Sequence, residues 1–410
     1  MLFFIRNLFS QRNTKKVRLR ANIELDMAFV FFVLGLLAFG WVMITSASMV
    51  DANYDYGNPY FYCIRQGFFA VLGIIAMTGA LLIPTDNYQK IYKLWLVVAF
   101  VLLIAVLIPH IGREVNGSRR WIPLFVINVQ VSELVKLCAI MYFSSYLVRF
   151  GDLARDTLKG VIKPLIILAA IAGLLLREPD FGACVVMFTC VFGIMFMAGV
   201  KLRWFIILIV LGGVAATFLV LFEPYRLARL NGFLDPWADA NNTGYQLVQA
   251  LIAYGRGGWL GDGLGSGIQK QFFLPEAHTD FIVSVIAEEL GVVGVIVLLA
   301  VYTYLIWKGM RIASFAYQLQ RYFQSYIAYG ISFWVAFQVI VNIGVNIGVL
   351  PTKGLTLPLI SYGGSSLLIM CFALGILLRI DFENKVIADE ISPRYVYKKV
   401  RGSRQVDRDI

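Results

Sequence analysis

Residues 27–47 read MAFVFFVLGLLAFGWVMITSA, a stretch of 21 residues without one charged side chain. A helix needs about 20 mostly apolar residues to cross the hydrocarbon core of a bilayer, so this stretch predicts a membrane-spanning helix. Similar apolar runs recur along the rest of the chain, and we place them near residues 66–84, 92–109, 131–148, 161–176, 181–199, 204–221, 281–306, 323–347 and 359–379. The sequence therefore predicts an all-α, polytopic membrane protein with about ten transmembrane helices. The first run is too long for the core of a signal peptide and is expected to be retained.

The composition agrees with this fold class. Of the 410 residues, 59% are hydrophobic and 15% are charged, and the mean hydropathy is +0.75. Soluble domains average about 45–50% apolar and about 25% charged residues, so an ordinary soluble enzyme and a disordered chain are excluded. The two histidines and the five cysteines, which show no Cys-x-x-Cys spacing, support neither a zinc site nor a disulfide framework.

The positions of lysine and arginine set the expected orientation. With the N-terminus inside, 25 of the 36 basic residues fall on the inside, 10 fall in outside loops and Lys136 lies within a span. This bias predicts that both tails are cytoplasmic. Residues 1–26 are then a basic N-terminal tail, 27–380 the membrane domain with a large extracytoplasmic loop at 222–280 between the seventh and eighth spans, and 381–410 a basic C-terminal tail. The net charge of +11 is thus a topology signal, and nucleic acid is not expected as a partner.

Ionisable groups in or beside the spans are the informative positions in so apolar a chain. Arg120, in Asn116-Gly-Ser-Arg-Arg-Trp121, is either an interfacial anchor or part of a phosphate clamp, because guanidinium matches phosphate oxygens. Glu133 and Lys136 share one helix face at a spacing of three residues. They form either a self-neutralising pair or a polar wall that faces a cavity, and we favour the wall.

Two further clusters lie at span ends that we place on the outside. In Glu178-Pro-Asp-Phe-Gly182 we favour a structural turn in which Asp180 caps the following helix. In Pro275-Glu-Ala-His-Thr-Asp-Phe281, Asp280 also sits where a cap would sit. The alternative is that Asp280, with His278 beside it, is a general base at the mouth of a cavity.

Residues 350–366, Leu-Pro-Thr-Lys-Gly-Leu-Thr-Leu-Pro-Leu-Ile-Ser-Tyr-Gly-Gly-Ser-Ser, interrupt a helix with two prolines and three glycines. Irregular backbone at membrane depth is tolerated where it is buried or lines a cavity, so we favour a functional role. Lys353 supplies a cation, and Ser361 and Ser366 supply hydroxyl groups. The glycine run at 255–267 fits no nucleotide-binding pattern and is expected to form tight turns. These groups together suggest a site for an anionic, membrane-borne substrate.

The 351–366, 275–281, 116–121 and 178–182 segments, with Glu288-Glu-Leu-Gly291, resemble the signatures of the SEDS family (shape, elongation, division and sporulation proteins). The resemblance extends from the first predicted span to the last. Thr352-Lys-Gly-Leu-Thr-Leu-Pro358 and the basic N-terminal tail are more similar to members that act in division than to those that act in elongation. One departure is Val131 after Gln130, where the family commonly has proline.

The resemblance implies a ten-helix peptidoglycan glycosyltransferase that polymerises lipid II at the outer face of the bacterial plasma (inner) membrane, at the division septum. Implied partners are a class B penicillin-binding protein, an FtsI-like transpeptidase, and other divisome proteins. The family's essential carboxylate falls on Asp280. Its other site residues fall on Arg120, Glu133, Lys136 and Lys353.

Our mechanistic hypothesis is that Asp280 activates the acceptor hydroxyl, while Arg120, Lys136 and Lys353 steady the phosphates of lipid II. The sequence shows no metal motif and identifies no cofactor with certainty. A divalent cation such as Mg²⁺ suits a carboxylate beside a pyrophosphate, and in that case Asp280 is a metal ligand and not a base. The main alternative function is a lipid II flippase, and a second is a non-catalytic scaffold that recruits division proteins.

Overall fold

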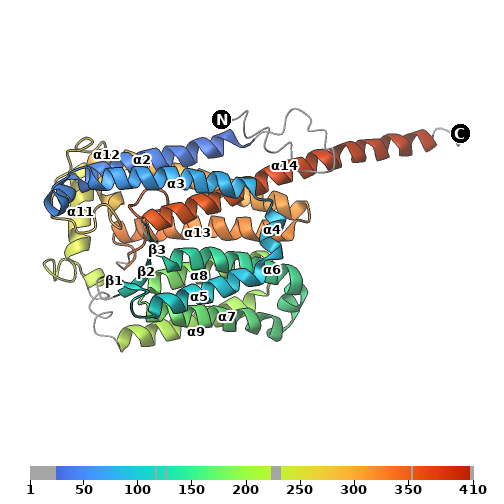
Figure 1. The fold of residues 1–410 in the computed structure, drawn as a ribbon, viewed down its shortest axis with the longest axis horizontal. Helices are drawn as coiled ribbons and strands as arrows, with labels where there is room; N and C mark the ends of the chain where they lie inside the picture. The colour runs from blue at the N-terminus through green and yellow to red at the C-terminus, as the bar shows by residue number, and fades with distance from the viewer. Residues whose placement is uncertain (1–24, 116–117, 125–126, 223–231, 352–353, 407–410) are drawn as a thin grey trace.

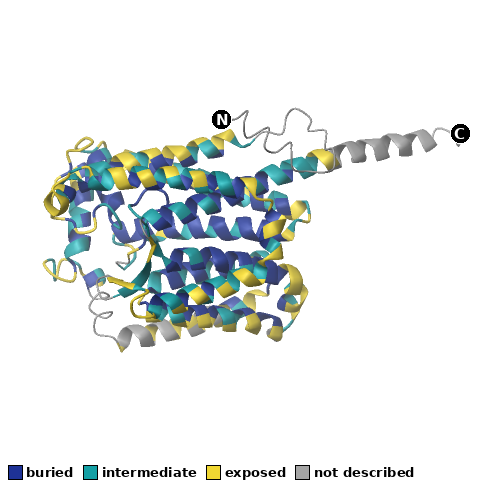
Figure 2. Cartoon of the chain, in the orientation of Figure 1, coloured by how far each residue is buried: buried dark blue, intermediate teal, exposed yellow. Residues whose placement is uncertain are grey.

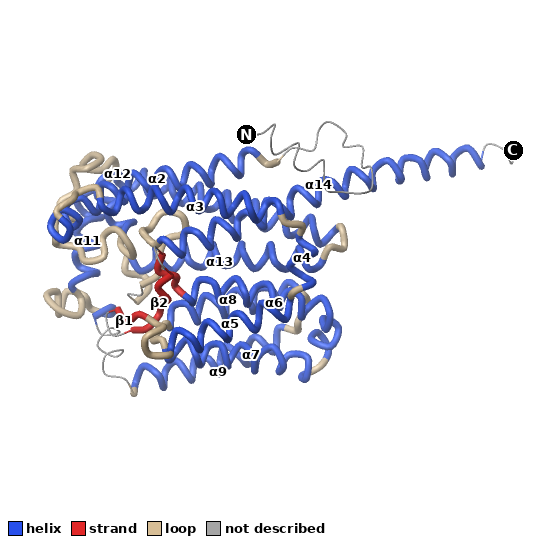
Figure 3. The backbone as a smooth tube through the Cα atoms, viewed as in Figure 1, coloured by secondary structure: helices blue, strands red, loops and turns tan. Residues whose placement is uncertain are grey.

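The computed structural model describes residues 25–115, 118–124, 127–222, 232–351 and 354–406. The chain is mostly helical (Figures 1 and 3). Its helices are α2 (Met27–Tyr56), α3 (Phe61–Leu82), α4 (Thr85–Lys90), α5 (Tyr92–Leu107), α6 (Val131–Asp156), α7 (Leu158–Arg177), α8 (Phe181–Met197), α9 (Leu202–Leu221), α11 (Tyr245–Gly257), α12 (Ile282–Gln318), α13 (Tyr322–Asn346) and α14 (Gly364–Val406).

The membrane-protein class is confirmed. Within the described residues, seven helices are long and apolar enough to cross a membrane, namely α2, α3, α6, α7, α12, α13 and α14. Three shorter apolar helices, α5, α8 and α9, fall on the remaining predicted runs. Exposed apolar residues such as Ile75, Val101 and Ile296 cover the outside of the bundle, whereas its interior is buried (Figure 2). Apolar surface on this scale fits a lipid environment.

The long connecting segments gather at one end of the bundle, which we call the loop end. It comprises a small sheet, α11, residues 258–281 and residues 354–363 (left in Figure 1). At the opposite end lie α4 and the part of α14 that projects beyond the bundle. The core is formed where α3 packs along α14, α12 along α13, and α13 against α6 and α8.

The small sheet departs from the all-α prediction. Strands β1 (Arg113–Val115), β2 (Ser118–Leu124) and β3 (Ile127–Gln130) pair antiparallel in the order β1-β2-β3 (Figure 3). The strands have only 3, 7 and 4 residues, which is too short for a clear alternating pattern. The Asn116-Gly117 dipeptide is the signal that favours a hairpin here, since it suits a tight two-residue turn.

The glycine run at 255–267 supplies hydrogen-bond partners for the backbone at a break in α12. Gly291 has a φ of +69° and interrupts the helix. The amides of Val292 and Val293 donate to the carbonyls of Gly258 and Trp259 at 3.0 and 3.1 Å. The backbone groups freed by the break are thus satisfied by the loop, as burial requires. The prediction of tight turns is confirmed, since several glycines of the run have positive φ, namely Gly258, Gly261, Gly263 and Gly265.

Candidate active site at the loop end

Asp280 is held by the end of α13. Its backbone carbonyl accepts hydrogen bonds from the side-chain amides of Asn342 at 3.0 Å and Asn346 at 2.9 Å. Asn346 also accepts from the amide and the hydroxyl of Ser284, at 3.1 and 2.8 Å. The N-cap of α12 is Phe281, so Asp280 does not occupy the cap position that we weighed as its structural role. Asp280 is half-buried, and its backbone carbonyl is held by two asparagine side chains.

The 354–363 segment lies directly against this loop. A Cβ on Gly354 would come within 2.7 Å of Oδ2 of Asp280, so the backbone of the segment approaches the carboxylate closely. The Asn342 amide also donates to the carbonyl of Leu355 at 2.6 Å. The amide of Tyr362 donates to the carbonyl of His278 at 2.9 Å. Two segments separated by about 70 residues of chain therefore form one unit around Asp280.

The predicted residues of this segment have distinct places. Ser361 is buried; its hydroxyl donates to the carbonyl of Thr279 at 2.6 Å and accepts from the amide of Leu357 at 2.8 Å. The hydroxyl of Ser366 lies 3.2 Å from that of Thr356. Both serines thus hold the segment in shape, and their contact with substrate stays a prediction. Lys353 lies outside the described residues.

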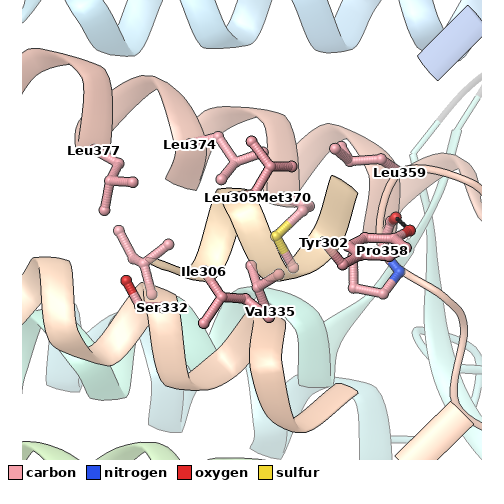
Figure 4. Close-up of a pocket in the computed structure, with 11 residues that line it drawn as sticks. Tyr302, Leu305, Ile306, Ser332, Val335, Pro358, Leu359, Met370, Leu374 and Leu377 are labelled. Carbon is pink, nitrogen blue, oxygen red and sulfur yellow. Dashed lines mark hydrogen bonds between the residues drawn. The ribbon is translucent and has the colours of Figure 1, made fainter. Parts of the chain in front are cut away.

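Beneath the segment is a small cavity between α12, α13 and α14 (Figure 4). Tyr302, which is fully buried, donates its hydroxyl to the carbonyl of Pro358 above it. The other lining residues are almost all apolar, and they include Leu305, Val335, Leu359 and Met370. This cavity offers no charged group to a phosphate, so the polar chemistry belongs to the surface around Asp280.

Arg120 joins a third motif to the site. Its guanidinium donates from Nε to the carbonyl of Glu178 at 3.0 Å and from Nη2 to that of Pro179 at 2.7 Å. The turn so held packs on the 354–363 segment, because a Cβ on Gly182 would lie 3.1 Å from Leu355. Arg120 therefore braces a turn that touches the segment beside Asp280.

The turn contains a buried carboxyl group. Glu178 is fully buried, and neither of its carboxyl oxygens has a hydrogen-bond partner among the described residues. Burial, reinforced by the nearby Asp180, raises the pKa of Glu178 to about 8, although Arg120 opposes the rise. Asp180 caps α8 by accepting from the amide of Ala183 at 3.1 Å, which confirms its predicted role.

Glu133 and Lys136 form a buried, self-neutralising pair, which is the alternative to the cavity-facing polar wall that we favoured. Lys136 Nζ lies 2.7 Å from Glu133 Oε1, and the two side chains are 0% and 5% exposed. The ammonium group also lies 4.9 Å from the ring centre of Trp334. Trp334 precedes Asn342 by eight helical residues, about 12 Å along α13, so the pair lies deeper than Asp280. Neutralisation within one helix is cheaper in a buried site than two separate charges, which accounts for the difference.

His278 lies between aromatic rings. Its ring centre is 4.5 Å from that of Tyr62 and 5.8 Å from that of Tyr362, and its Nδ1 is 3.9 Å from Oδ2 of Asp51. Burial lowers the pKa of His278, with Glu276 and Asp55 opposing, so the imidazole is neutral at pH 7. His278 therefore does not provide a positive charge beside Asp280 at pH 7.

Two buried carboxylates anchor the loop that carries Asp280. Glu288 accepts from the amides of Ile268 and Gln269 and pairs with Arg256 at 3.2 Å. Glu289 pairs with Lys270 at 2.5 Å and accepts from the hydroxyl of Ser46 and the amide of Gly265. The Glu288-Glu-Leu-Gly291 motif thus fixes residues 258–281 at the break in α12.

Sequence reasoning missed three residues of the site, namely Asn342, Asn346 and Tyr62. The two asparagines lie four residues apart in an apolar run, and this spacing puts them on one helix face, which was an available signal. Tyr62 gave no signal, since an isolated tyrosine beside a span is normal in a membrane protein.

Metal binding is limited by the residues present. No group of three or more His, Cys, Asp or Glu side chains in the described part of the chain could hold a metal ion. Any ion at Asp280 would therefore need substrate oxygens to complete its ligands.

Comparisons with known proteins agree with this arrangement. Residues 27–386 match the FtsW/RodA/SpoVE family model, described as cell cycle protein. The probable peptidoglycan glycosyltransferase FtsW of Francisella salina is 59% identical over 98% of this chain and 100% of its own length. The protein of the same name from Allochromatium vinosum is 52% identical over 89% of this chain and 91% of its own.

Solved structures show the same fold. A chain of a peptidoglycan synthase complex, described as coordinating polymerization and crosslinking, superposes with a TM-score of 0.71 at 29% identity, covering 88% of this chain and 98% of that one. The rod shape determining protein RodA of Thermus thermophilus gives a TM-score of 0.65 at 26% identity, covering 89% and 99%. The chain belongs to the FtsW/RodA/SpoVE family of cell cycle proteins, the SEDS family, and within that family it is FtsW-like.

Proposed function

We propose that the chain is a peptidoglycan glycosyltransferase that polymerises lipid II into glycan strands during septal cell-wall synthesis. The names of the relatives support this reaction. The alignments with these relatives cover most of the chain, at 45–59% identity. One observation carries the proposal: Asp280, the Gly354 segment and the Arg120-braced turn converge at the loop end. A scaffold has no need for a carboxylate fixed in this way.

The reaction needs a base and a cationic surface. An acceptor hydroxyl attacks the anomeric carbon of a lipid-linked sugar, the bond from that carbon to the pyrophosphate oxygen breaks, and undecaprenyl pyrophosphate leaves. Asp280 accepts the proton of the attacking hydroxyl, in our proposal the 4-hydroxyl of GlcNAc. In our proposal, Lys353 and the N–H groups of Arg120 that do not hold the turn at Glu178 and Pro179 stabilise the growing negative charge on the pyrophosphate. Lys136 joins them only if its pair with Glu133 opens, because that pair is closed in the structure.

The membrane topology follows from charge. We propose ten spans, in which α5, α8 and α9 join the seven longer helices, with both tails cytoplasmic and the loop end outside. The site is then on the side where a lipid-linked sugar is polymerised. A class B penicillin-binding protein is the proposed partner, supported by the similarity to a peptidoglycan synthase complex. Mg²⁺ at Asp280, shared with the pyrophosphate, remains a proposal beside the general-base role.

The test is polymer formation from purified lipid II in detergent. Wild type and Asp280→Asn are each assayed with and without the cognate class B penicillin-binding protein. We expect the wild-type complex to make glycan polymer and Asp280→Asn to lose at least about 100-fold in rate. Asn keeps the size of the side chain, so the folded protein should be retained.

Each other outcome is informative. Polymer made at a normal rate by folded Asp280→Asn would remove this carboxylate from the chemistry. If no folded, partner-bound sample makes polymer, lipid translocation in vesicles would be measured next, because the flippase then explains the buried Glu133–Lys136 pair better.

A further inference from the structure

Five aromatic side chains from four segments pack on one another at the loop end. We call this group the aromatic platform. It contains residues from the end of α2, the start of α3 and the two motif segments, namely Tyr56, Phe61, Tyr62, His278 and Tyr362. None of them reacts in the mechanism above, yet His278 precedes Asp280 by only two residues. At about 3.5 Å per residue, the platform begins within about 7 Å of the carboxylate-bearing residue along the chain.

The rings form a continuous series. Tyr56 stacks on Phe61 with ring centres 3.8 Å apart and an interplanar angle of 10°. Tyr62 meets Phe61, Tyr362 and His278 at 5.3, 4.9 and 4.5 Å. Tyr56 remains 52% exposed, so the outer end of the platform is open to a ligand, whereas its inner end is buried against the loop of Asp280. A path of ring faces and edges thus leads from the surface towards Asp280.

Polar groups border the rings. The guanidinium of Arg65 lies 4.8 Å from the ring centre of Phe61 and close to the phenol of Tyr362. Asp51 places a half-buried carboxylate 3.9 Å from the imidazole of His278. Ligand sites of this type combine apolar ring surface with a few polar groups that fix orientation. Pyranose rings match both features, since they present apolar C–H faces and a rim of hydroxyl groups.

The ordinary role of such residues is different. Tyrosines near span ends commonly form a belt at the membrane surface, where each ring faces the lipid headgroups. Tyr60, on the same turn and 51% exposed, fits that role, because no ring contact of Tyr60 occurs among the described residues. The platform rings instead pack on each other, in a series that runs from Tyr56 and Phe61 to His278 in the loop of Asp280.

We propose that the aromatic platform is a carbohydrate subsite that holds the acceptor glycan next to Asp280. The position beside Asp280 rests on the proposed function, whereas the binding of a sugar chain to the platform can be tested without it. Stacking would hold the acceptor sugars while lipid II is attached, so the platform would govern affinity for glycan and the length of the strand.

The test uses a soluble, fluorescently labelled tetrasaccharide of alternating GlcNAc and MurNAc, titrated into full-length protein in detergent. Tyr56→Leu removes the ring but keeps apolar volume, and Tyr56→Phe keeps the ring. Tyr60→Leu is the matched control, with the same residue type and equal exposure. We expect Tyr56→Leu to bind at least about fivefold more weakly, and Tyr56→Phe and Tyr60→Leu to stay within about twofold of wild type.

A parallel assay on lipid II separates this proposal from the proposed function. Shorter glycan strands from Tyr56→Leu, at unchanged melting temperature, support the subsite. Selective loss of tetrasaccharide binding in a protein whose wild type makes no polymer would keep the subsite and overturn the polymerase. Wild-type polymer without tetrasaccharide binding, or equal losses in Tyr56→Leu and Tyr60→Leu, would overturn the subsite.

Discussion

Gly354 occupies a position where a side chain would meet the carboxylate of Asp280. A Cβ there would lie 2.7 Å from Oδ2, well inside contact distance. Gly354→Ala must displace either the carboxylate or the segment, and a displacement of about 1 Å in a catalytic group can cost about 100-fold in rate. We expect polymerisation by Gly354→Ala to fall at least about tenfold with little change in melting temperature.

The control for this prediction lies in the same segment. A Cβ on Gly363 would be no nearer than 3.5 Å to any atom, an ordinary contact. Gly363→Ala should therefore keep polymerisation near the wild-type rate. Equal losses in the two variants, measured as initial rates on lipid II, would mean that the segment tolerates no substitution at all and that proximity to Asp280 is not the cause.

Glu178 gives the fold a dependence on pH. Its pKa is about 8 when folded and near the ordinary 4.5 when unfolded, so the folded state binds an extra proton between these values. The contribution of Glu178 to the free energy of unfolding is then fully present below about pH 4.5, and it declines as the pH rises to about 8. Glu178→Gln removes the ionisation, so its melting temperature should exceed that of wild type at pH 8, and the difference should shrink at pH 5.

A thiol-reactive dye can follow this unfolding, because four of the five cysteines are buried. Glu114→Gln is the control, since Glu114 is 54% exposed and its pair with Arg119 is a surface pair. A pH profile of Glu178→Gln parallel to that of wild type would show that Glu178 does not bind the extra proton.

Among the elements, the loop at 258–281 is held in place by a buried ion pair between Lys270 and Glu289. Lys270 and Glu289 are 5% and 0% exposed and lie 2.5 Å apart, so removing one partner leaves the other charge buried and unpaired. Such losses cost about 3–5 kcal/mol. Lys270→Met should lower the free energy of unfolding by about this amount, and adding Glu289→Gln should recover part of it. A double-mutant cycle on melting curves measures the coupling.

A surface pair provides the comparison for that cycle. Lys201 and Asp156 are 48% and 71% exposed at 3.2 Å, and such pairs contribute little. Lys201→Met should leave the melting curve almost unchanged. If Lys270→Met were equally neutral, the loop would be held by its backbone contacts to Glu288 and to the break in α12, and not by the Lys270–Glu289 pair.

The helices could be predicted from the sequence, because long apolar runs such as 27–47 have few alternatives to a spanning helix. The motifs suggested that Asp280 and the 351–366 segment converge. They did not show the contact between them, since it depends on Asn342 and Gly354 meeting across the fold.

The state of Glu133 and Lys136 was mispredicted, because their spacing shows that the two charges share a helix face and does not show whether a cavity lies beside them. The sheet at 113–130 was missed because its strands are short.

On the scale of the whole molecule, basic residues divide unevenly between the predicted inside and outside segments of the sequence, 25 against 10. By the positive-inside rule, this bias predicts that the loop end lies outside the cytoplasm. The same end carries Asp280 and the aromatic platform, so orientation decides whether the site can act on an extracytoplasmic substrate.

We therefore expect alkaline phosphatase fused after residue 241, in the exposed stretch before α11, to be active, and a fluorescent protein fused after residue 410 to fluoresce. Alkaline phosphatase folds only outside the cytoplasm, where its disulfides form, and the usual fluorescent proteins mature only inside. A fusion of the phosphatase after residue 200, between α8 and α9, is the matched control and should be inactive. The opposite pattern of the three reporters would place Asp280 on the cytoplasmic side, where a polymerase of exported glycan could not work.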